Sequence, residues 1–236
     1  MPANVVAVTG FVPLGLRNVS NDKFRALGAD LVQAIADGGA LVHEFDNFPL
    51  HECWMFKWLF EHDKLGIQPA RPVASDRFTS AFHKVQSDSV MHQKMEWTRM
   101  ALDATAEPLA DVYVWIDYGI LKQPQMTKEV VTRFFQKVIA NPPTDNILAP
   151  GLRDPETTDH EFSWERFAGM YIVPAAYVRQ MTDKMRDEAL AMIRETDRLW
   201  FETDALVHLE RRGELPVQQY KSWWGASMIE NYPAVP

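Results

Sequence analysis

The stretch DVYVWIDYGIL, Asp111 to Leu121, decides the fold. It contains the unbroken apolar run VYVWI, which is followed by the single carboxylate of Asp117 and then by a Tyr-Gly pair. An apolar run without alternation is typical of a strand buried on both faces, as in the parallel sheet of an α/β protein. We therefore expect a central strand over 111–117 that ends on an acidic side chain.

A strand, a helix and a second strand precede this stretch. NVVAVTG (4–10) is a short β-branched run closed by glycine, residues 22–36 repeat apolar side chains at helical spacing, and ALVHEF (40–45) is a second strand. Such a unit pairs its strands in parallel with a right-handed crossover. The three segments therefore predict the first half of a parallel sheet.

The remainder of the chain alternates further helices and strands. The expected helices lie at 52–64, at 87–106, from 124 onward, after 174 and at 197–211, and the expected strands lie within 141–151 and 167–174. We expect 152–164 to be a surface loop and the aromatic tail, 220–232, to pack onto the body. The fold class is therefore α/β, with a mostly parallel central sheet flanked by helices in one domain, 1–236.

Composition narrows the function classes. The 236 residues carry a net charge of −8, so a protein whose main task is to bind nucleic acid is possible but not favoured. The single cysteine, Cys53, excludes an internal disulfide and fits a reducing compartment. We expect a cytoplasmic chain without a signal peptide or a membrane span, because no segment approaches the roughly 20 apolar residues that a span requires.

Small and acidic residues follow three of the expected strands. Ligands of open α/β sheets bind at the carboxyl ends of the strands, where Thr9-Gly10, Asp46 and Asp117 should share one edge. A carboxylate there can hold Mg²⁺ or Mn²⁺ together with phosphate oxygens, and Gly119 should let a ligand approach the backbone. The alternative is that Asp-Tyr-Gly is an ordinary turn.

The same stretch resembles a known family. VYVWIDYGI is similar to the strand that carries the acidic metal motif in GT-A type, nucleotide-sugar-dependent glycosyltransferases, and more narrowly to the WIDFG signature of the HtrL/YibB-like bacterial family. VAVTGF, RFAGMYIVP, WFETDALVHL and WWGASMIENY follow the family's order of parts. The resemblance implies a GT-A-like Rossmann-type domain with a nucleotide-sugar-binding half (1–120) and an acceptor-side half (121–236). The family's D-x-D is reduced here to one aspartate.

The resemblance also implies roles for individual residues. Asp117 would hold Mn²⁺ or Mg²⁺ and the donor diphosphate. Lys94 and Arg99 would lie near the phosphates; taken alone, either residue fits a solvated helix face better. The residues that would bind the donor are Thr9, Gly10, Phe11, Asp46, Lys94, Arg99 and Trp115.

The helix expected at 197–211 supplies candidates for a catalytic base. Glu202 falls on an otherwise apolar stripe, so it should either have a buried partner or face a cleft. Sugar transfer with inversion needs a carboxylate that takes the proton of the acceptor hydroxyl, and Glu202 and Asp204 are the candidates. The alternative is structural, with Glu202 paired to an arginine and Asp204 to His208.

These observations favour a glycosyltransferase that moves a sugar from a nucleotide-sugar, such as a UDP-sugar, to a hydroxyl acceptor. The acceptor would be a surface glycan or a modified nucleobase. One alternative is a GT-A-like nucleotide- or sugar-binding protein that has lost catalysis, which the missing D-x-D supports. Another is a different α/β enzyme, such as a phosphotransferase, although the sequence has neither a P-loop nor a G-x-G-x-x-G motif.

Overall fold

The computed structural model describes residues 3–14, 20–70, 80–104, 110–151, 169–222 and 225–233. The expected surface loop at 152–164 and the tryptophan pair of the tail lie outside these ranges. Within them, no helix is long and apolar enough to span a membrane.

The central sheet has the strand order β2-β1-β4-β6-β5-β8, and only β6 runs antiparallel to its neighbours. Its strands are β1 (Val5–Gly10), β2 (Leu41–Phe45), β4 (Val112–Ile116), β5 (Ile147–Gly151), β6 (Met170–Pro174) and β8 (Val217–Lys221). The pair β1–β2 is parallel, as predicted, and β4 pairs in parallel with the other edge of β1. A short parallel pair, β3 (Gln68–Pro69) with β7 (Arg198–Leu199), stands apart from the main sheet.

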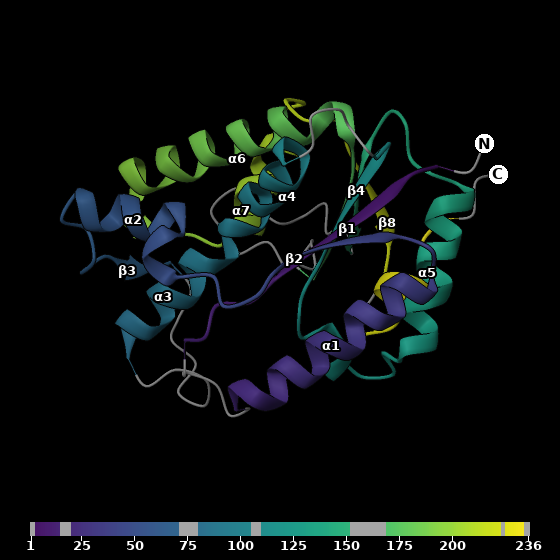
Figure 1. Ribbon diagram of the computed structural model, residues 1–236. Helices are drawn as coiled ribbons and strands as arrows, with labels where there is room; N and C mark the ends of the chain where they lie inside the picture. The colour runs from purple at the N-terminus through teal and green to yellow at the C-terminus, as the bar shows by residue number, and fades with distance from the viewer. Residues whose placement is uncertain are drawn as a thin grey trace.

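Helices cover both faces of this sheet. They are α1 (Asn21–Asp37), α2 (Trp54–Glu61), α3 (Ala81–Met91), α4 (Gln93–Asp103), α5 (Lys128–Ala140), α6 (Ala175–Thr196), α7 (Glu202–Arg211) and α8 (Ser227–Glu230), with single 3₁₀ turns η1 (Leu50–Glu52) and η2 (Ile120–Lys122). Figure 1 shows α4, α6 and α7 on one side of the sheet and α1 and α5 on the other. The predicted fold class, a mixed α/β domain with a mostly parallel sheet flanked by helices, is confirmed, and the arrangement is consistent with a GT-A-like fold.

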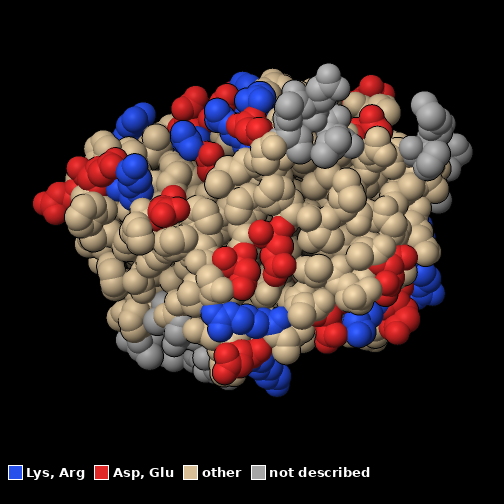
Figure 2. All heavy atoms as spheres, viewed as in Figure 1, with Lys and Arg blue, Asp and Glu red and all other residues tan. Residues whose placement is uncertain are grey.

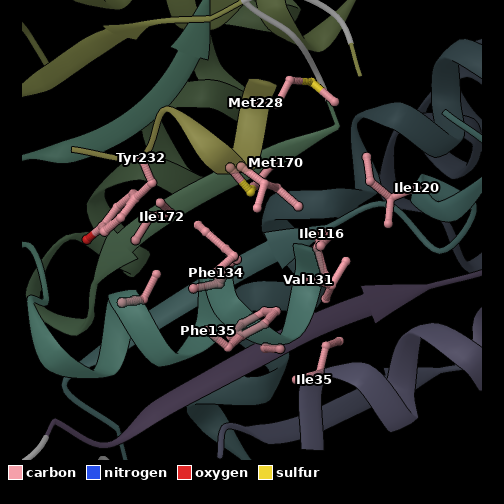
Figure 3. Close-up of a cluster of buried hydrophobic side chains, with 14 of the residues drawn as sticks. Ile35, Ile116, Ile120, Val131, Phe134, Phe135, Met170, Ile172, Met228 and Tyr232 are labelled. Atoms are coloured by element: carbon pink, nitrogen blue, oxygen red, sulfur yellow. The ribbon is translucent and has the colours of Figure 1, made fainter. Parts of the chain in front are cut away.

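Strand β4 is buried on both faces, as its sequence predicts. Val112, Val114 and Ile116 point into the core beneath α1 and α5, whereas Tyr113 and Trp115 point into the core beneath α4 and α6. Figure 3 shows the first core, where side chains of α1, β4, α5, β6 and the C-terminal region converge. The alternation matters for function, because it fixes the direction of every side chain near the end of β4.

The prediction of a single helix at 87–106 is wrong. The segment belongs to two helices, α3 and α4, which meet at His92. The carbonyl of His92 accepts a hydrogen bond from Trp54 Nε1 at 2.8 Å, and Trp54 N–H is bonded to Gln93 Oε1 at 2.9 Å. These contacts from α2 hold the junction. Apolar spacing along one helix could not indicate them, because the donor lies about forty residues earlier in the chain.

The C-terminal part also differs from the expectation. The helix expected at 197–211 begins only at Glu202, because Arg198–Leu199 forms the short strand β7 and the carbonyl of Leu199 accepts from Ala70 N at 2.7 Å. The tail does pack onto the body, through β8 and α8, but its strand was not expected. Strand β8 is the edge strand of the sheet, and most of its side chains are polar. Its place in the sheet is set by parallel pairing with β5.

The loop after β4 is fixed by contacts to α1. A Cβ on Gly28 would lie 1.9 Å from Tyr118 Cζ, and a Cβ on Gly119 would lie 2.6 Å from the Phe24 ring. The expectation that Gly119 leaves space for a ligand is therefore wrong. The missing side chain leaves space for the Phe24 ring. Burial raises the pKa of the Tyr118 hydroxyl, and the nearby Glu44 carboxylate raises that pKa further.

We predict that Gly28→Ala lowers the free energy of unfolding by about 1–3 kcal/mol, because the added methyl group overlaps Tyr118. Alanine has the higher helix propensity, by about 1 kcal/mol, so a packing penalty has to exceed that gain to be seen. Urea unfolding measures the difference. Gly66→Ala is the matched control, because nothing lies within 4 Å of its added Cβ. A Gly28→Ala variant as stable as the wild type would contradict the described packing.

Candidate functional site

Three parallel strands bring the predicted residues to one edge of the sheet. Strand β1 lies between β2 and β4, so Gly10, Asp46 and Asp117 follow the carboxyl ends of neighbouring strands. Asp117 is fixed there by its backbone, since its N–H donates to Gly169 O and its carbonyl accepts from Ile120 N, both at 2.9 Å. Its side chain is 35% exposed, so this carboxylate is accessible from solvent.

Alternation along β4 directs Asp117 toward α4. Asp117 follows Trp115 by two residues and therefore points to the same face of the sheet. On that face the ring of Trp115 stacks on Trp97 of α4 at 5.5 Å between centroids. Lys94 lies one helical turn before Trp97, so its side chain reaches the end of β4.

A buried ammonium group links two carboxylates at this point. Lys94 Nζ lies 3.1 Å from Asp117 Oδ1 and 2.9 Å from Glu202 Oε1. Trp115 Nε1 also donates to Asp117 Oδ1, at 3.0 Å. Lys94 and Glu202 are each only 1% exposed, so Asp117 is the member of the cluster that meets solvent. We refer to Lys94, Asp117 and Glu202 as the charge cluster.

Burial and mutual attraction set the electrostatics of the charge cluster. Burial raises the pKa of the Glu202 carboxyl, and the Lys94 ammonium opposes that rise. Burial alone would lower the pKa of Lys94, but the carboxylates of Asp117 and Glu202 outweigh it and raise the pKa. The shift therefore favours the protonated form of Lys94. Glu202 is the first residue of α7, where the helix dipole favours a negative charge.

The position of Lys94 settles two expectations from the sequence, one about Lys94 itself and one about the partner of Glu202. Lys94 does not lie on a solvated helix face, because it is buried against the end of β4. Glu202 does have a buried charged partner, as its place on an apolar stripe predicted, but that partner is a lysine rather than an arginine. The signal for Lys94 was in the sequence: it shares one face of its helix with Trp97 and Ala101, both of which are buried.

The predicted donor-binding residues of β1 are packed into the protein. Thr9 is fully buried and its hydroxyl donates to Ile116 O at 2.7 Å. A Cβ on Gly10 would lie 2.7 Å from the Trp97 ring, so the glycine admits that ring. Phe11 is stacked between Phe24 and Tyr118, at 5.6 and 5.4 Å. These residues shape the edge of the sheet, and Trp115 is likewise buried.

Asp46 lies exposed at the end of β2 and belongs to a polar group that the sequence did not reveal. Arg25 of α1 approaches Asp46 to 4.0 Å and hydrogen-bonds the side chain of Asn47, and its guanidinium lies 6.0 Å from the centre of the Phe11 ring. Arg25 therefore brings a positive charge to the same edge. Its position near the start of an ordinary amphipathic helix gave no signal of this role.

Arg99 and Asp204 point to other partners. Arg99 pairs with Asp183 of α6 at 2.9 Å and with Asp103 at 3.6 Å. Asp204 is buried, and its Oδ2 accepts from Phe201 N–H at 3.2 Å, which caps the start of α7. His208, the other residue considered for a pair with Asp204, bonds Glu188 through Nδ1 at 3.0 Å. The structure thus joins Glu202, but not Arg99, to Asp117 through Lys94.

The described ranges contain no group of three or more His, Cys, Asp or Glu residues arranged to hold a metal ion. A cation at this edge would therefore have Asp117 as its acidic ligand and would need oxygens from a ligand or water. Figure 2 shows acidic and basic side chains interspersed on the face it presents, with a group of acidic side chains near its centre. That face lacks the broad basic area that a phosphate backbone would require.

A comparison with solved structures finds chains of similar fold, among them a glycosyltransferase. The chain aligns with a glycosyltransferase involved in the glycosylation of the major capsid of PBCV-1, over 92% of this chain and 82% of the other, with a TM-score of 0.49 and 9% identity. No family model matches the chain, so membership of the HtrL/YibB-like family stays a prediction. No curated protein matches it. At this identity and score the likeness says nothing about the reaction, which has to be inferred from the side chains.

We predict that Lys94→Met lowers the free energy of unfolding by about 3–5 kcal/mol, because it leaves the buried Glu202 carboxylate without its cation. The double variant Lys94→Met/Glu202→Gln should recover a large part of that loss, since both charges are then gone. Urea unfolding of the two single variants and the double variant gives the coupling energy. Additive losses would show that the ion pair does not stabilise the fold as described.

His92 generates a prediction about pH. Its Nε2–H donates to Trp200 O at 2.9 Å, and burial lowers its pKa from 6.5 to about 4. Between these values the unfolded chain binds a proton that the folded chain does not, so stability falls as the pH is lowered from about 6.5 to about 4. The loss attributable to His92 should reach about 3 kcal/mol.

Unfolding of the wild type and of His92→Gln across this pH range measures that loss. The variant should show the shallower decline, because glutamine can donate to Trp200 O but does not titrate. Both proteins contain Glu202, whose raised pKa acts in the opposite direction, so its contribution cancels in the comparison. Equal slopes would refute a buried, neutral His92.

Proposed function

We propose that this protein is a glycosyltransferase that transfers a sugar from a nucleotide-sugar, with a UDP-sugar as the first candidate, to a hydroxyl acceptor. The observation that carries the proposal is the accessible Asp117 carboxylate at the shared carboxyl edge of β1 and β4, held by a buried lysine. This edge is where open α/β sheets bind nucleotides. The sequence resemblance of VYVWIDYGI to the acidic strand of GT-A enzymes supports the same assignment.

A divalent cation fits this site through one oxygen of Asp117. Within the described part of the chain, the bonds to the carboxylate are made by Oδ1, which leaves Oδ2 for a ligand. The charge cluster holds two carboxylates and one ammonium, so it has an excess negative charge when all three groups are ionised. Mg²⁺ or Mn²⁺ binds through one carboxylate plus phosphate oxygens and water, and when bound it would neutralise the charge that develops on the leaving diphosphate.

Lys94 acts in this proposal as a positioning residue. With Trp115 it fixes Asp117 Oδ1, so that the carboxylate has one orientation before the donor arrives. Such preorganisation costs no rearrangement at the moment of reaction. Arg25, at the end of the neighbouring strands, is a candidate for contact with the nucleotide, in addition to Asp46.

Glu202 is the base that we favour over Asp204, because it belongs to the charge cluster and Asp204 caps α7. A base has to reach within hydrogen-bond distance of the acceptor hydroxyl. Both carboxylates are buried in the described conformation, so base catalysis by either requires local opening near the start of α7. The acceptor is a surface glycan or, second, a modified nucleobase.

A binding protein without turnover is the second candidate. Two observations favour it: Asp117 already has a cationic partner in Lys94, and both candidate bases are buried. Such a protein would keep the edge of the sheet for nucleotide recognition and would release no sugar. Nucleotide-induced stabilisation without metal, together with intact UDP-sugar after long incubation, would identify this case.

We predict that UDP and Mn²⁺ together raise the melting temperature of the wild type by about 5–10 °C at a concentration near a hundred times the dissociation constant. Either one alone should have much less effect, because Asp117 supplies only one ligand. In Asp117→Asn the metal-dependent part should disappear while the fold persists, since asparagine can still accept from Trp115 Nε1. GDP and CDP test the choice of base.

Asp111→Asn is the matched control, because Asp111 precedes β4, at the opposite end of the strand from Asp117, and its Oδ2 accepts from Asn4 N–H at 3.0 Å. That variant should respond to UDP and Mn²⁺ as the wild type does. If Asp117→Asn also gives the full metal-dependent shift, Asp117 is not the cation ligand. If no nucleotide shifts the wild type, the assignment to nucleotide-sugar chemistry fails.

A further inference from the structure

A small cavity adjoins the charge cluster, since Glu202 lines it, whereas Asp117 does not. It has a volume of about 10 Å³ and is lined by Glu202 of α7, by Thr182 and Arg186 of α6, and by residues of α2, α3 and α4. A volume of this size accommodates about one water molecule and nothing larger.

Two complementary polar atoms belong to residues that line this cavity. Glu202 Oε2 is a buried acceptor and Arg186 Nε–H is a buried donor, and neither has a hydrogen-bond partner among the described residues. Glu202 uses its other oxygen for Lys94, and Arg186 uses a terminal nitrogen for Glu96. A buried polar group without a hydrogen-bond partner destabilises the fold, so leaving both atoms without partners would destabilise it twice.

Thr182 supplies a third polar atom. Its hydroxyl donates to Val178 O at 2.8 Å, so its oxygen still has a lone pair to accept a hydrogen bond. Buried waters typically make about three hydrogen bonds to groups that otherwise lack partners. One donor and two acceptors around a cavity of one-water size match that requirement.

We infer that this cavity is a binding site for a single structural water, which accepts from Arg186 Nε–H and donates to Glu202 Oε2 and to Thr182 Oγ1. The water completes the hydrogen bonding of Glu202, which can then remain an ionised partner for Lys94. It also joins the charge cluster to the Arg186–Glu96 pair of α6 and α4. The result is a continuous polar chain from the edge of the sheet to the far surface of α4 and α6. The inference does not depend on the proposed function.

A crystal structure at a resolution that shows ordered water tests the site. The wild type should have one density peak within hydrogen-bond distance of Glu202 Oε2 and Arg186 Nε. In Arg186→Met the peak should be lost, because the only donor to the water is gone. Arg179→Met is the matched control: Arg179 lies on the same helix and pairs with Asp103, but it does not line the cavity. Its crystal structure should keep the water.

A measurement on the wild type in solution tests the same water without requiring that any variant folds and crystallises. In the wild type, the Arg186 Nε–H should show a rotating-frame Overhauser cross-peak to a long-lived water. Three results would overturn the inference: no density and no cross-peak in the wild type, a Glu202 carboxylate turned so that Oε2 meets a protein donor, or the same water present in Arg186→Met.

Discussion

The rest of the site depends on one constraint, which is that the ammonium group of Lys94 is buried and has to be compensated. A charge without partners in the protein interior would cost many kcal/mol, so the chain has to bring carboxylates to it. It does so from two directions, with Asp117 at the end of β4 and Glu202 at the start of α7, which lies 108 residues further along the chain than Lys94. Because Lys94 needs these carboxylates, α4, the end of β4 and the start of α7 meet at the carboxyl edge of the sheet.

Packing around the charge cluster makes that point rigid. Trp97 and Trp115 stack directly beside it, and Gly10 leaves room for the Trp97 ring at the end of β1. On the other side of the sheet, Tyr118 and Gly119 are pressed against α1, so the loop that carries Asp117 cannot shift without disturbing that helix. Residues that looked like nucleotide contacts, such as Phe11 and Trp115, therefore contribute by shaping the edge. Within the charge cluster, the group that solvent reaches is the Asp117 carboxylate, which is held in place through Oδ1.

This arrangement bears on how a sugar transferase could work with a single aspartate in place of D-x-D. An isolated carboxylate at a sheet edge would be free to rotate, whereas Asp117 is held through Oδ1 by Lys94 and Trp115. The excess negative charge of the cluster favours a cation that arrives with a diphosphate, and the inferred water behind Glu202 would let that charge persist. The same features suit a protein that binds nucleotides without turnover. The two functions differ in one requirement: a sugar transferase has to expose a base during the reaction, whereas a binding protein does not.

The sequence by itself determined the parallel pairing of β1 with β2, the position of Asp117 at the carboxyl end of a buried strand, and the expectation that Glu202 either has a buried partner or faces a cleft. These follow from local periodicity, from the handedness of strand-helix-strand units and from the cost of a carboxylate on an apolar stripe. Only the tertiary structure decided that the partner is Lys94, that α3 and α4 separate at His92, that β8 joins the sheet, and that Gly10 and Gly119 admit aromatic rings. Each of these is set by a contact between segments distant in sequence. Local pattern carries no information about such a partner, because the energy of a buried ion pair or of a ring against a glycine exists only once both sides are in place.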